Sequence, residues 1–236
     1  AAKGGERIDI SHAAGLKSDR GGIVVAYDFT RDWHFDTVRA GLTGPSPFDI
    51  KLTRFDARPA NTRHAFYSSG RYRIGDGIEL YGDGLYTTES KQTRLAYTGP
   101  GFDFSRNTGI KSRQYSAVLG LKADLGASWR LDVSANHGGV RTRERIDDLL
   151  STRRLRRSAR LTEVSAVLDG PLFAIGSHEV KGAFGAEYRN EAIRTPRERG
   201  SRNIYSAFGE LSIPLDLGIG TVELSAAGRY DRYSDF

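Results

Sequence analysis

Residues 221–236 read TVELSAAGRYDRYSDF, and their alternation decides the fold class. From residue 222 to residue 230, apolar or small side chains occupy every second position, and mostly polar side chains occupy the positions between them. One set is Val222, Leu224, Ala226, Gly228 and Tyr230, and the other is Glu223, Ser225, Ala227 and Arg229. A period of two residues predicts a β-strand that has one apolar face and one polar face.

The same alternation recurs along the chain, in GGIVVAYDFTR (21–31), SWRLDVSANHGG (128–139) and EVKGAFGAEYRNE (179–191). A charged face that continues over this length needs water, and an apolar face of this composition suits lipid. Aromatic residues near the strand ends predict interfacial girdles. These residues are Tyr115, Trp129, Tyr188, Tyr205 and Tyr230.

Connections between the strand candidates alternate between short and long. Short, glycine-rich connections lie at 17–21, 75–77, 125–128, 174–177 and 217–220, and longer polar connections lie at 32–62, 96–111, 145–157 and 195–202. This divides the chain into ten strands arranged as five hairpins. Membrane barrels have short periplasmic turns and long extracellular loops, whereas sandwiches have shorter strands. We therefore predict an all-β fold, an antiparallel transmembrane β-barrel segment. A soluble β-domain with one wet face is the alternative.

Composition excludes several other classes of protein. The chain has 236 residues, of which 38% are hydrophobic, and its mean hydropathy is −0.47. No apolar run approaches the roughly 18 residues that a membrane helix requires, which excludes a helical membrane protein. The absence of cysteine excludes disulfide bonds and thiolate metal sites.

Positive charge is concentrated in one stretch, VRTRERIDDLLSTRRLRRSAR (140–160), within a chain of net charge +6. We interpret this stretch as a surface loop that carries a basic patch. The patch consists of Arg141, Arg143, Arg153, Arg154, Arg156 and Arg157. A solvated loop, a loop that faces anionic lipopolysaccharide or an anionic ligand, and a nucleic-acid patch are the competing interpretations.

No motif predicts catalysis or a cofactor. The five histidines fall in separate segments without the spacing of metal ligands. They are His12, His34, His64, His137 and His178. The nucleophile-elbow, phosphate-loop and calcium-loop patterns are missing as well. We therefore expect no catalytic residue, no metal ligand and no cofactor, and we do not expect an enzyme.

Four phrases carry a family resemblance: RYRIGDGIELYGDGLYTTES (71–90), GAFGAEYRNE (182–191), IYSAFGELSIPL (204–215) and VELSAAGRYDRYSDF (222–236). They resemble the barrel of TonB-dependent receptors, the active transporters of the Gram-negative outer membrane. The resemblance implies the outer membrane as location and uptake of a scarce nutrient, such as siderophore-bound iron, a vitamin or a saccharide. It implies outer-membrane lipid, lipopolysaccharide and the energy-coupling protein TonB as partners, and an unidentified small molecule as ligand.

The resemblance also implies that residues 1–236 are an internal portion of one barrel domain. Barrels of this family have about 22 strands and enclose an N-terminal plug, and a segment ahead of the plug contacts TonB. We expect the plug, that segment and the remaining strands to lie outside this chain. A native barrel end favours apolar or aromatic residues at alternate positions before the final Phe. Arg232 and Ser234 occupy these positions, so Phe236 does not look like an assembly signal.

Parity along the strands selects the side chains that we expect to line the lumen. They are Arg130, Asp132, Lys181, Glu187, Arg189, Glu210, Arg229 and Asp231. The runner-up hypothesis is a self-contained ten-stranded barrel that acts as a passive pore or a rim protease. A third hypothesis is a soluble, arginine-rich nucleic-acid binder. The alternation of short turns and long loops argues against it, and we expect no nucleic acid as partner.

Overall fold

The computed structural model describes residues 5–36, 51–99, 101–176, 178–216 and 220–234. These residues are almost entirely β-strand. The strands are β1 (Arg7–Ser18), β2 (Gly21–Asp32), β3 (Phe35–Asp36), β4 (Lys51–Arg58), β5 (Ala60–Gly75), β6 (Ile78–Gly99), β7 (Phe102–Gly126), β8 (Trp129–Asp148), β9 (Thr152–Ile175), β10 (His178–Arg194), β11 (Arg199–Asp216) and β12 (Thr221–Tyr233). Among the described residues, no helix is long and apolar enough to cross a membrane.

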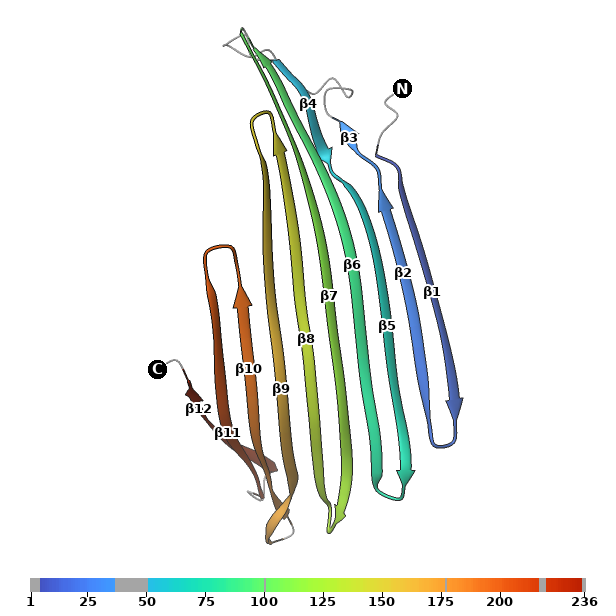
Figure 1. The fold of residues 1–236 in the computed structure, drawn as a ribbon. Helices are drawn as coiled ribbons and strands as arrows, with labels where there is room; N and C mark the ends of the chain where they lie inside the picture. The colour runs from blue at the N-terminus through green and yellow to red at the C-terminus, as the bar shows by residue number, and fades with distance from the viewer. Residues whose placement is uncertain (1–4, 37–50, 100, 177, 217–219, 235–236) are drawn as a thin grey trace.

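Ten long strands lie side by side in the order β1-β2-β5-β6-β7-β8-β9-β10-β11-β12, and β3 and β4 join at the side of this path. Figure 1 shows the tight turns after β1, β5 and β7 gathered at one end of the sheet, together with the ends of β9 and β11, and we call this end the turn end. The opposite end is the loop end. The short connections predicted at 17–21, 75–77 and 125–128 are confirmed as hairpin turns. The predicted connections 174–177 and 217–220 include residues 177 and 217–219, which lie outside the described part, and the strands that flank them pair as antiparallel neighbours.

Positive φ angles occur in several of the tight turns, including Gly176 after β9 with a φ of 62°. Gly77 has a φ of 80° between β5 and β6, and Ala127 and Ser128 have φ angles of 50° and 63° between β7 and β8. Glycine adopts this conformation without steric cost. Gly126, directly before Ala127, has a φ of 84° and follows a shift in register, as in a β-bulge. The two consecutive positive φ angles of Ala127 and Ser128 are typical of a type I′ turn. These turns fix the register of their hairpins.

The strands run further toward the loop end than the sequence predicted. The predicted connection 96–111 is mostly strand, because β6 ends at Gly99 and β7 begins at Phe102. Only 149–151 separate β8 from β9, instead of 145–157, and only 195–198 separate β10 from β11. Charged residues occupy both faces in these stretches, and this pattern in a sequence predicts a loop rather than a strand. Charge on both faces also suits a strand that has water on both sides.

The predicted connection 32–62 contains β3 and β4, while its residues 37–50 lie outside the described part. Phe55 of β4 lies opposite Leu95 of β6, and Ala60 of β5 lies opposite Gln92 of the same strand. β4 therefore lies beside β6 in the position that β5 occupies nearer the turn end. Pro59, which has no N–H to donate, lies between the two strands and interrupts them.

A buried carboxylate anchors β4 to β6. The side chain of Asp56 is fully buried; it accepts a hydrogen bond from the Arg94 backbone N over 2.7 Å and another from Arg94 Nη2 over 3.0 Å. His34 Nδ1 lies 3.0 Å from the same carboxylate. A buried charge must be paired to be tolerated, so Arg94 and His34 make this anchor possible.

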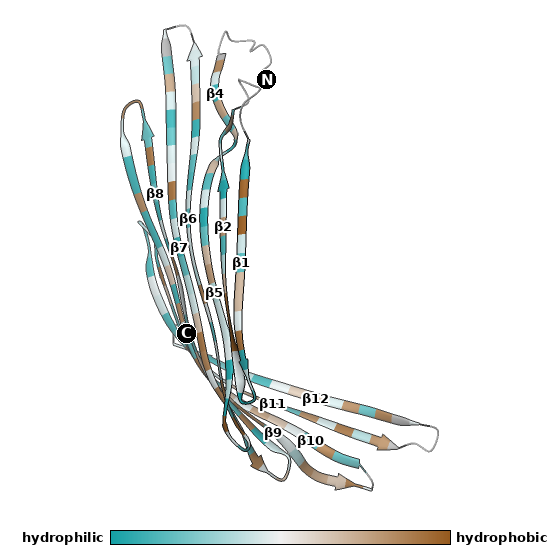
Figure 2. Cartoon of the chain, turned by 90° about the vertical axis from the view of Figure 1, so that its right-hand side faces the viewer, coloured by the Kyte–Doolittle hydropathy of each residue, from teal (hydrophilic) through white to brown (hydrophobic). Residues whose placement is uncertain are grey.

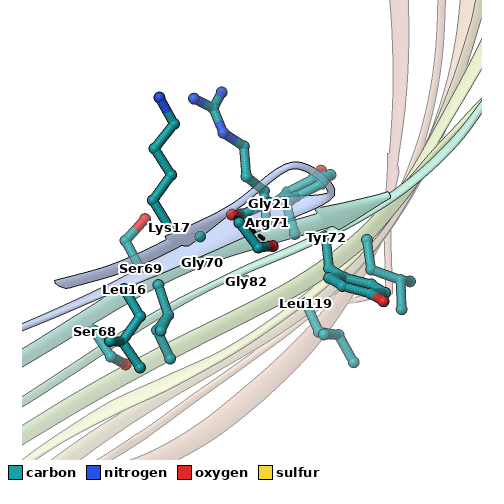
Figure 3. Close-up of a pocket in the computed structure, with 15 residues that line it drawn as sticks. Leu16, Lys17, Gly21, Ser68, Ser69, Gly70, Arg71, Tyr72, Gly82 and Leu119 are labelled. Carbon is teal, nitrogen blue, oxygen red and sulfur yellow. Dashed lines mark hydrogen bonds between the residues drawn. The ribbon is translucent and has the colours of Figure 1, made fainter. Parts of the chain in front are cut away.

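The register divides the side chains between two faces. Residues directly opposite each other in antiparallel strands share a face. Asp132 lies opposite Lys122 and Val167, and the same row reaches Phe208, which lies opposite Arg229. We call this face the polar face, and the face that carries Leu131 the apolar face. In Figure 3, Lys17 and Arg71 project from one side of the ribbon, and Leu16 and Leu119 project from the other.

The sheet is a single layer without a conventional core. Val180 and Ile204 are the only buried apolar side chains among the described residues. Leu119 is 66% exposed and Leu224 is 51% exposed, both on the apolar face. A water-soluble β-domain would cover such a face with a second layer, and the described residues form none. This exposed apolar face argues against the soluble alternatives.

The sheet is open and strongly curved. Figure 2 shows β11 and β12 running in a different direction from β1 and β2, with hydropathy alternating along the strands. Within the described residues, β1 pairs only with β2, and β12 pairs only with β11. Curvature of this kind follows from the right-handed twist of strands, which accumulates across a sheet.

Aromatic rings pack onto glycines of neighbouring strands. Tyr81 lies opposite Gly120 and Phe208 lies opposite Gly185. A Cβ atom at either glycine would overlap the opposing ring. Glycine therefore provides the space in which each ring lies flat against the sheet.

Gly120→Ala should displace the ring of Tyr81 and destabilise the fold by about 1–3 kcal/mol, because overpacking forces side chains off their rotamers. Urea unfolding in detergent micelles measures this loss. Gly109→Ala is the matched control on β7, because a Cβ atom there meets no atom within 4 Å. Equal stability of the two variants would contradict the packing argument.

Candidate functional site

A network of charges on the polar face surrounds Arg189 of β10. Arg189 Nε donates a hydrogen bond to Glu163 Oε2 of β9 over 2.9 Å, and its Nη2 forms an ionic contact of 2.7 Å with Glu187 Oε1. Glu191 Oε1 lies 3.9 Å from Arg189 Nη1, and Arg202 Nε of β11 donates to Glu191 Oε2 over 2.8 Å. One guanidinium thus faces three carboxylates.

Arg229 extends this network to β12. Its Nε donates to Asp231 Oδ1 over 2.9 Å, and its Nη2 donates to Ser206 Oγ over 2.9 Å. Nη2 also lies 3.5 Å from Glu187 Oε2. Glu187, whose side chain is only 11% exposed, therefore lies between Arg189 and Arg229. The network fixes these side chains across four neighbouring strands.

A second group of polar contacts lies nearer the turn end. The Tyr81 hydroxyl donates to Asp132 Oδ1 over 2.7 Å, and Lys122 Nζ lies 5.1 Å from the centre of the Tyr81 ring. Arg130 Nη2 donates to Asp169 Oδ2 over 2.9 Å. Two further ion pairs on this face are Arg7–Asp9 at 2.6 Å and Arg63–Asp28 at 2.8 Å. The polar face is therefore charged along most of the sheet.

The structure places all eight lumen candidates on the polar face. Six of them take part in the contacts just described: Arg130, Asp132, Glu187, Arg189, Arg229 and Asp231. Lys181 and Glu210 form no ion pair or hydrogen bond through their side chains with described residues. Sequence reasoning missed Glu163, Glu191 and Arg202, although the alternation through Glu187 and Arg189 continues to Glu191.

Aromatic residues form a belt across the apolar face. Neighbouring strands place these rings directly opposite one another. The rows are Tyr27–Phe66–Tyr86–Tyr115 on β2, β5, β6 and β7, and Tyr188–Tyr205 on β10 and β11. The rings of Tyr188 and Tyr205 are 5.2 Å apart. Such a belt is typical of the membrane–water interface of outer-membrane barrels.

The aromatic belt forms one border of an apolar band, whose height is comparable to that of the apolar band of outer-membrane barrels. On β8, Trp129 lies near the turn end, and His137 lies 3.3 Å from the Tyr115 hydroxyl. The segment from Trp129 to His137 has nine residues and spans about 26 Å along the strand. This length corresponds to roughly 20 Å across the membrane once the strand tilt is included. All five predicted girdle residues lie on the apolar face, and Tyr230 is 70% exposed.

A notch in the apolar face lies near the turn end (Figure 3). It has a volume of about 490 Å³, and Leu16, Ile23, Leu80 and Leu119 contribute its apolar walls. Gly70, between β2 and β6, leaves room for it. The composition of this notch suits hydrocarbon chains rather than a charged ligand.

Small residues leave hollows on both faces between β7 and β11. On the polar face, Val140, Leu161 and Ile193 border a cavity of about 830 Å³. On the apolar face, a cavity of about 730 Å³ lies beside Tyr115 and Gly139. The two hollows share the same rows of the sheet, so the wall is thin there.

The predicted basic patch lies on strands rather than in a loop, and the sheet divides it. Arg157 Nη1 lies 3.5 Å from Glu144 Oε2 on the polar face, and Arg153 Nη2 lies 3.9 Å from Asp148 Oδ2. The other four members project from the opposite face, beyond the aromatic belt. They are Arg141, Arg143, Arg154 and Arg156.

Nothing in the described part of the chain resembles a metal centre. No group of three or more His, Cys, Asp or Glu side chains converges there. His34 contacts Asp56 and His137 contacts Thr162, so each of these two histidines has a structural partner. The arrangement offers a charged wall, and it offers no constellation for nucleophilic or acid–base chemistry that we can identify among these residues.

The comparisons with known proteins agree with this geometry. The family model described as TonB dependent receptor-like, beta-barrel matches residues 45–236. The chain belongs to the TonB-dependent receptor β-barrel family. No curated protein matches the sequence significantly.

Two solved structures resemble this receptor barrel. The outer membrane transporter YddB from Escherichia coli matches with a TM-score of 0.64 and 14% identity, over 97% of this chain and 34% of that one. The ferric citrate transporter FecA in its unliganded form matches with a TM-score of 0.50 and 10% identity, over 94% and 35%. This chain thus spans about a third of the length of either transporter, and the likeness concerns the fold.

Arg189→Gln in this receptor barrel should destabilise the fold by about 1–3 kcal/mol, because it removes the cation that three partly buried carboxylates share and leaves Glu163 without an ion pair among the described residues. Urea unfolding in detergent micelles near neutral pH should show the loss. Arg130→Gln is the control, because that side chain is 69% exposed and has one carboxylate partner. A loss as large in the control would refute the network.

The tip of the β8–β9 hairpin depends on a carboxylate outside the apolar band. Asp148 Oδ1 accepts hydrogen bonds from Ser151 Oγ over 3.0 Å and from the Ser151 backbone N over 2.9 Å. These bonds hold the pKa of Asp148 below its usual range. The pKa of Asp147 is lowered too, first by the Thr152 hydroxyl and then by Arg145.

Because these pKa values are lowered in the folded tip, the carboxylates stabilise it above about pH 4. This stabilisation is lost as the pH falls through the lowered values. Amide exchange at Ser151, corrected for its intrinsic rate, should therefore stay constant from about pH 6 to about pH 4 and accelerate as the pH falls further. The β10–β11 tip is the control, because the Thr195 hydroxyl, which does not titrate, accepts from the Glu198 backbone N there. Parallel acceleration at both tips would count against the role of Asp148.

Proposed function

We propose that this chain forms part of the barrel of a TonB-dependent outer-membrane transporter that takes up a scarce nutrient. One observation carries the proposal: a sheet of this family has a belted apolar face and a charged face on opposite sides of a single layer. The first face suits lipid and the second suits a wet lumen. Such a wall separates membrane from passage.

The charged wall would line the route of the ligand. Arg189 and Arg229 present guanidinium groups beside carboxylates, so cations and anions alternate along this face. Polar ligands can exchange hydrogen bonds with such a surface without being trapped by a single charge. Siderophore-bound iron, a vitamin and a saccharide remain the proposed nutrient classes. We assign no catalytic role and no cofactor to these residues.

The remaining parts of the transporter would lie elsewhere in the receptor. We propose that a plug domain and additional strands complete the barrel, since the chain spans about a third of YddB and FecA. The energy-coupling protein TonB would contact a segment outside this chain. Displacement of the plug would then open the route along the charged wall.

Uptake assays in cells test the proposal. Cells that express the complete receptor, with and without TonB, are given radiolabelled ferric siderophores, cobalamin and maltodextrins. One of these probes should accumulate only where both the receptor and TonB are present. Glu187→Gln should lower that uptake several-fold, because it removes the carboxylate between Arg189 and Arg229.

Two results would contradict the proposal. Recovery of the receptor in the soluble fraction would remove the membrane assignment. Uptake that proceeds equally without TonB would identify a passive pore instead of an energised transporter. Lys181→Gln is the matched control for Glu187→Gln, because Lys181 lies on the same strand and face and its side chain has no partner among the described residues.

A further inference from the structure

A hollow on the polar face has an apolar floor. Val140 of β8 lies opposite Ala159 of β9, and Ala159 lies opposite Ile193 of β10. Leu161 follows Ala159 by two residues and therefore shares its face. These four side chains line the cavity of about 830 Å³ that lies between β7 and β11. We call this cavity the wall hollow.

The floor of the wall hollow is exposed. Ile193 is 54% exposed and Val140 is 37% exposed. Gly138 and Gly200 line the same cavity and have no side chain that could cover these residues. Removal of exposed hydrocarbon from water is favourable in proportion to its area. The floor can therefore contribute binding free energy to a ligand that presents an apolar group.

Charged groups border the wall hollow on both sides along the strands. Toward the loop end, Arg157 Nη1 lies 3.5 Å from Glu144 Oε2. Toward the turn end, Arg202 Nε donates a hydrogen bond to Glu191 Oε2 over 2.8 Å, and both residues line the hollow. Gln114, which is exposed, adds an amide group at the β7 side. The rim therefore offers donors and acceptors, and its positive and negative charges are balanced.

This composition distinguishes among the proposed nutrient classes. A saccharide presents many hydroxyl groups, which would lose hydrogen bonds with water against an apolar floor. A polyanionic chelate requires unpaired cations, whereas Arg157 and Arg202 already face carboxylates. An uncharged organic molecule with hydrocarbon surface and a few amide or hydroxyl groups matches both the floor and the rim. Uncharged iron chelates and vitamins of the cobalamin type share this chemistry.

The wall hollow lies level with the aromatic belt, on the opposite side of the sheet. Tyr115 of the belt lies opposite Gly139, and Val140 follows Gly139 directly and projects from the other face. An aromatic belt marks the border of the hydrocarbon region. The hollow is therefore near the loop end of the wall, where a ligand that enters from outside would arrive first.

We propose that the wall hollow binds the hydrocarbon part of an uncharged organic nutrient. Glu191, Arg202 and Gln114 would exchange hydrogen bonds with the polar groups of the same molecule. The inference rests on the proposed transport function and names the class of nutrient within it, which is an uncharged chelate or vitamin instead of a saccharide or a polyanion. Val140 and Ile193 are then residues that determine specificity.

Ligand binding to the purified complete receptor tests this assignment and does not require TonB. Equilibrium dialysis measures dissociation constants for four water-soluble probes. They are the uncharged iron chelate ferrichrome, cyanocobalamin, maltohexaose and the trianionic chelate ferric enterobactin. The test variant is Val140→Thr/Ile193→Thr. The control is Val118→Thr/Val167→Thr, which changes two β-branched residues of the polar face that do not line the hollow.

Ferrichrome or cyanocobalamin should bind to the wild-type receptor and to the control variant, and which of the two binds separates chelate from vitamin. Maltohexaose and ferric enterobactin should bind at least tenfold more weakly. The test variant should bind the preferred probe about tenfold more weakly, because each substitution replaces hydrocarbon at the floor by a hydroxyl group. Ile193→Thr alone, at the more exposed position, decides the question if the double variant fails to fold.

Four results would overturn the proposal. Preference for maltohexaose or ferric enterobactin would show that the class of nutrient is wrong. Binding of none of the four probes would show that the hollow does not serve this class. Equal weakening in the test and control variants would show a general effect on the fold. Protection of Ile193→Cys from a water-soluble maleimide in the ligand-free receptor would show that another part of the receptor fills the hollow.

Failure of this inference and failure of the proposed function give different results. Uptake of maltodextrin that depends on TonB would support transport and contradict the role of the wall hollow. Binding of ferrichrome or cyanocobalamin that weakens in Val140→Thr/Ile193→Thr, together with uptake that does not depend on TonB, would support the role of the hollow and contradict energised transport.

Discussion

Residues that lie directly opposite each other in antiparallel strands share a face, and every other feature of this molecule depends on that constraint. A single register connects Lys122 on β7 with Arg229 on β12. A slip of one residue would move Arg229 into the belt and Tyr230 into the charged network. The network and the belt are therefore consequences of the same pairing, and neither can change without the other.

Much of the fold follows from local signals in the sequence. Residues 222–230 alternate cleanly because their two sides meet different surroundings, and glycine-rich turns mark the hairpins. The signal fails at 145–157, where charges occupy both faces and β8 and β9 continue as strands. It fails again at β4, because Pro59 separates β4 from β5 although both strands pair with the same side of β6.

The charged site was only partly predictable for a different reason. Parity alone places Glu187, Arg189 and Arg229 on one side of their strands. Their partners, Glu163 and Arg202, come from neighbouring strands. The sequence of a single strand does not determine its register with the next strand, so these pairs could not be predicted. The same holds for the arginines of 153–157, which look continuous in sequence. The pleat sends alternate members to opposite sides, so that Arg153 and Arg157 approach Asp148 and Glu144 while Arg154 and Arg156 lie on the other face.

The hollows between β7 and β11 have a mechanical consequence. A sheet resists bending largely through the side chains that touch along its surfaces. Gly138 and Gly139 have no side chain, and Gly200 on β11 extends the same thin zone. Fewer side chains touch one another along this line, which crosses the wall just beside the aromatic belt. We therefore expect any bending of the wall to involve this thin zone.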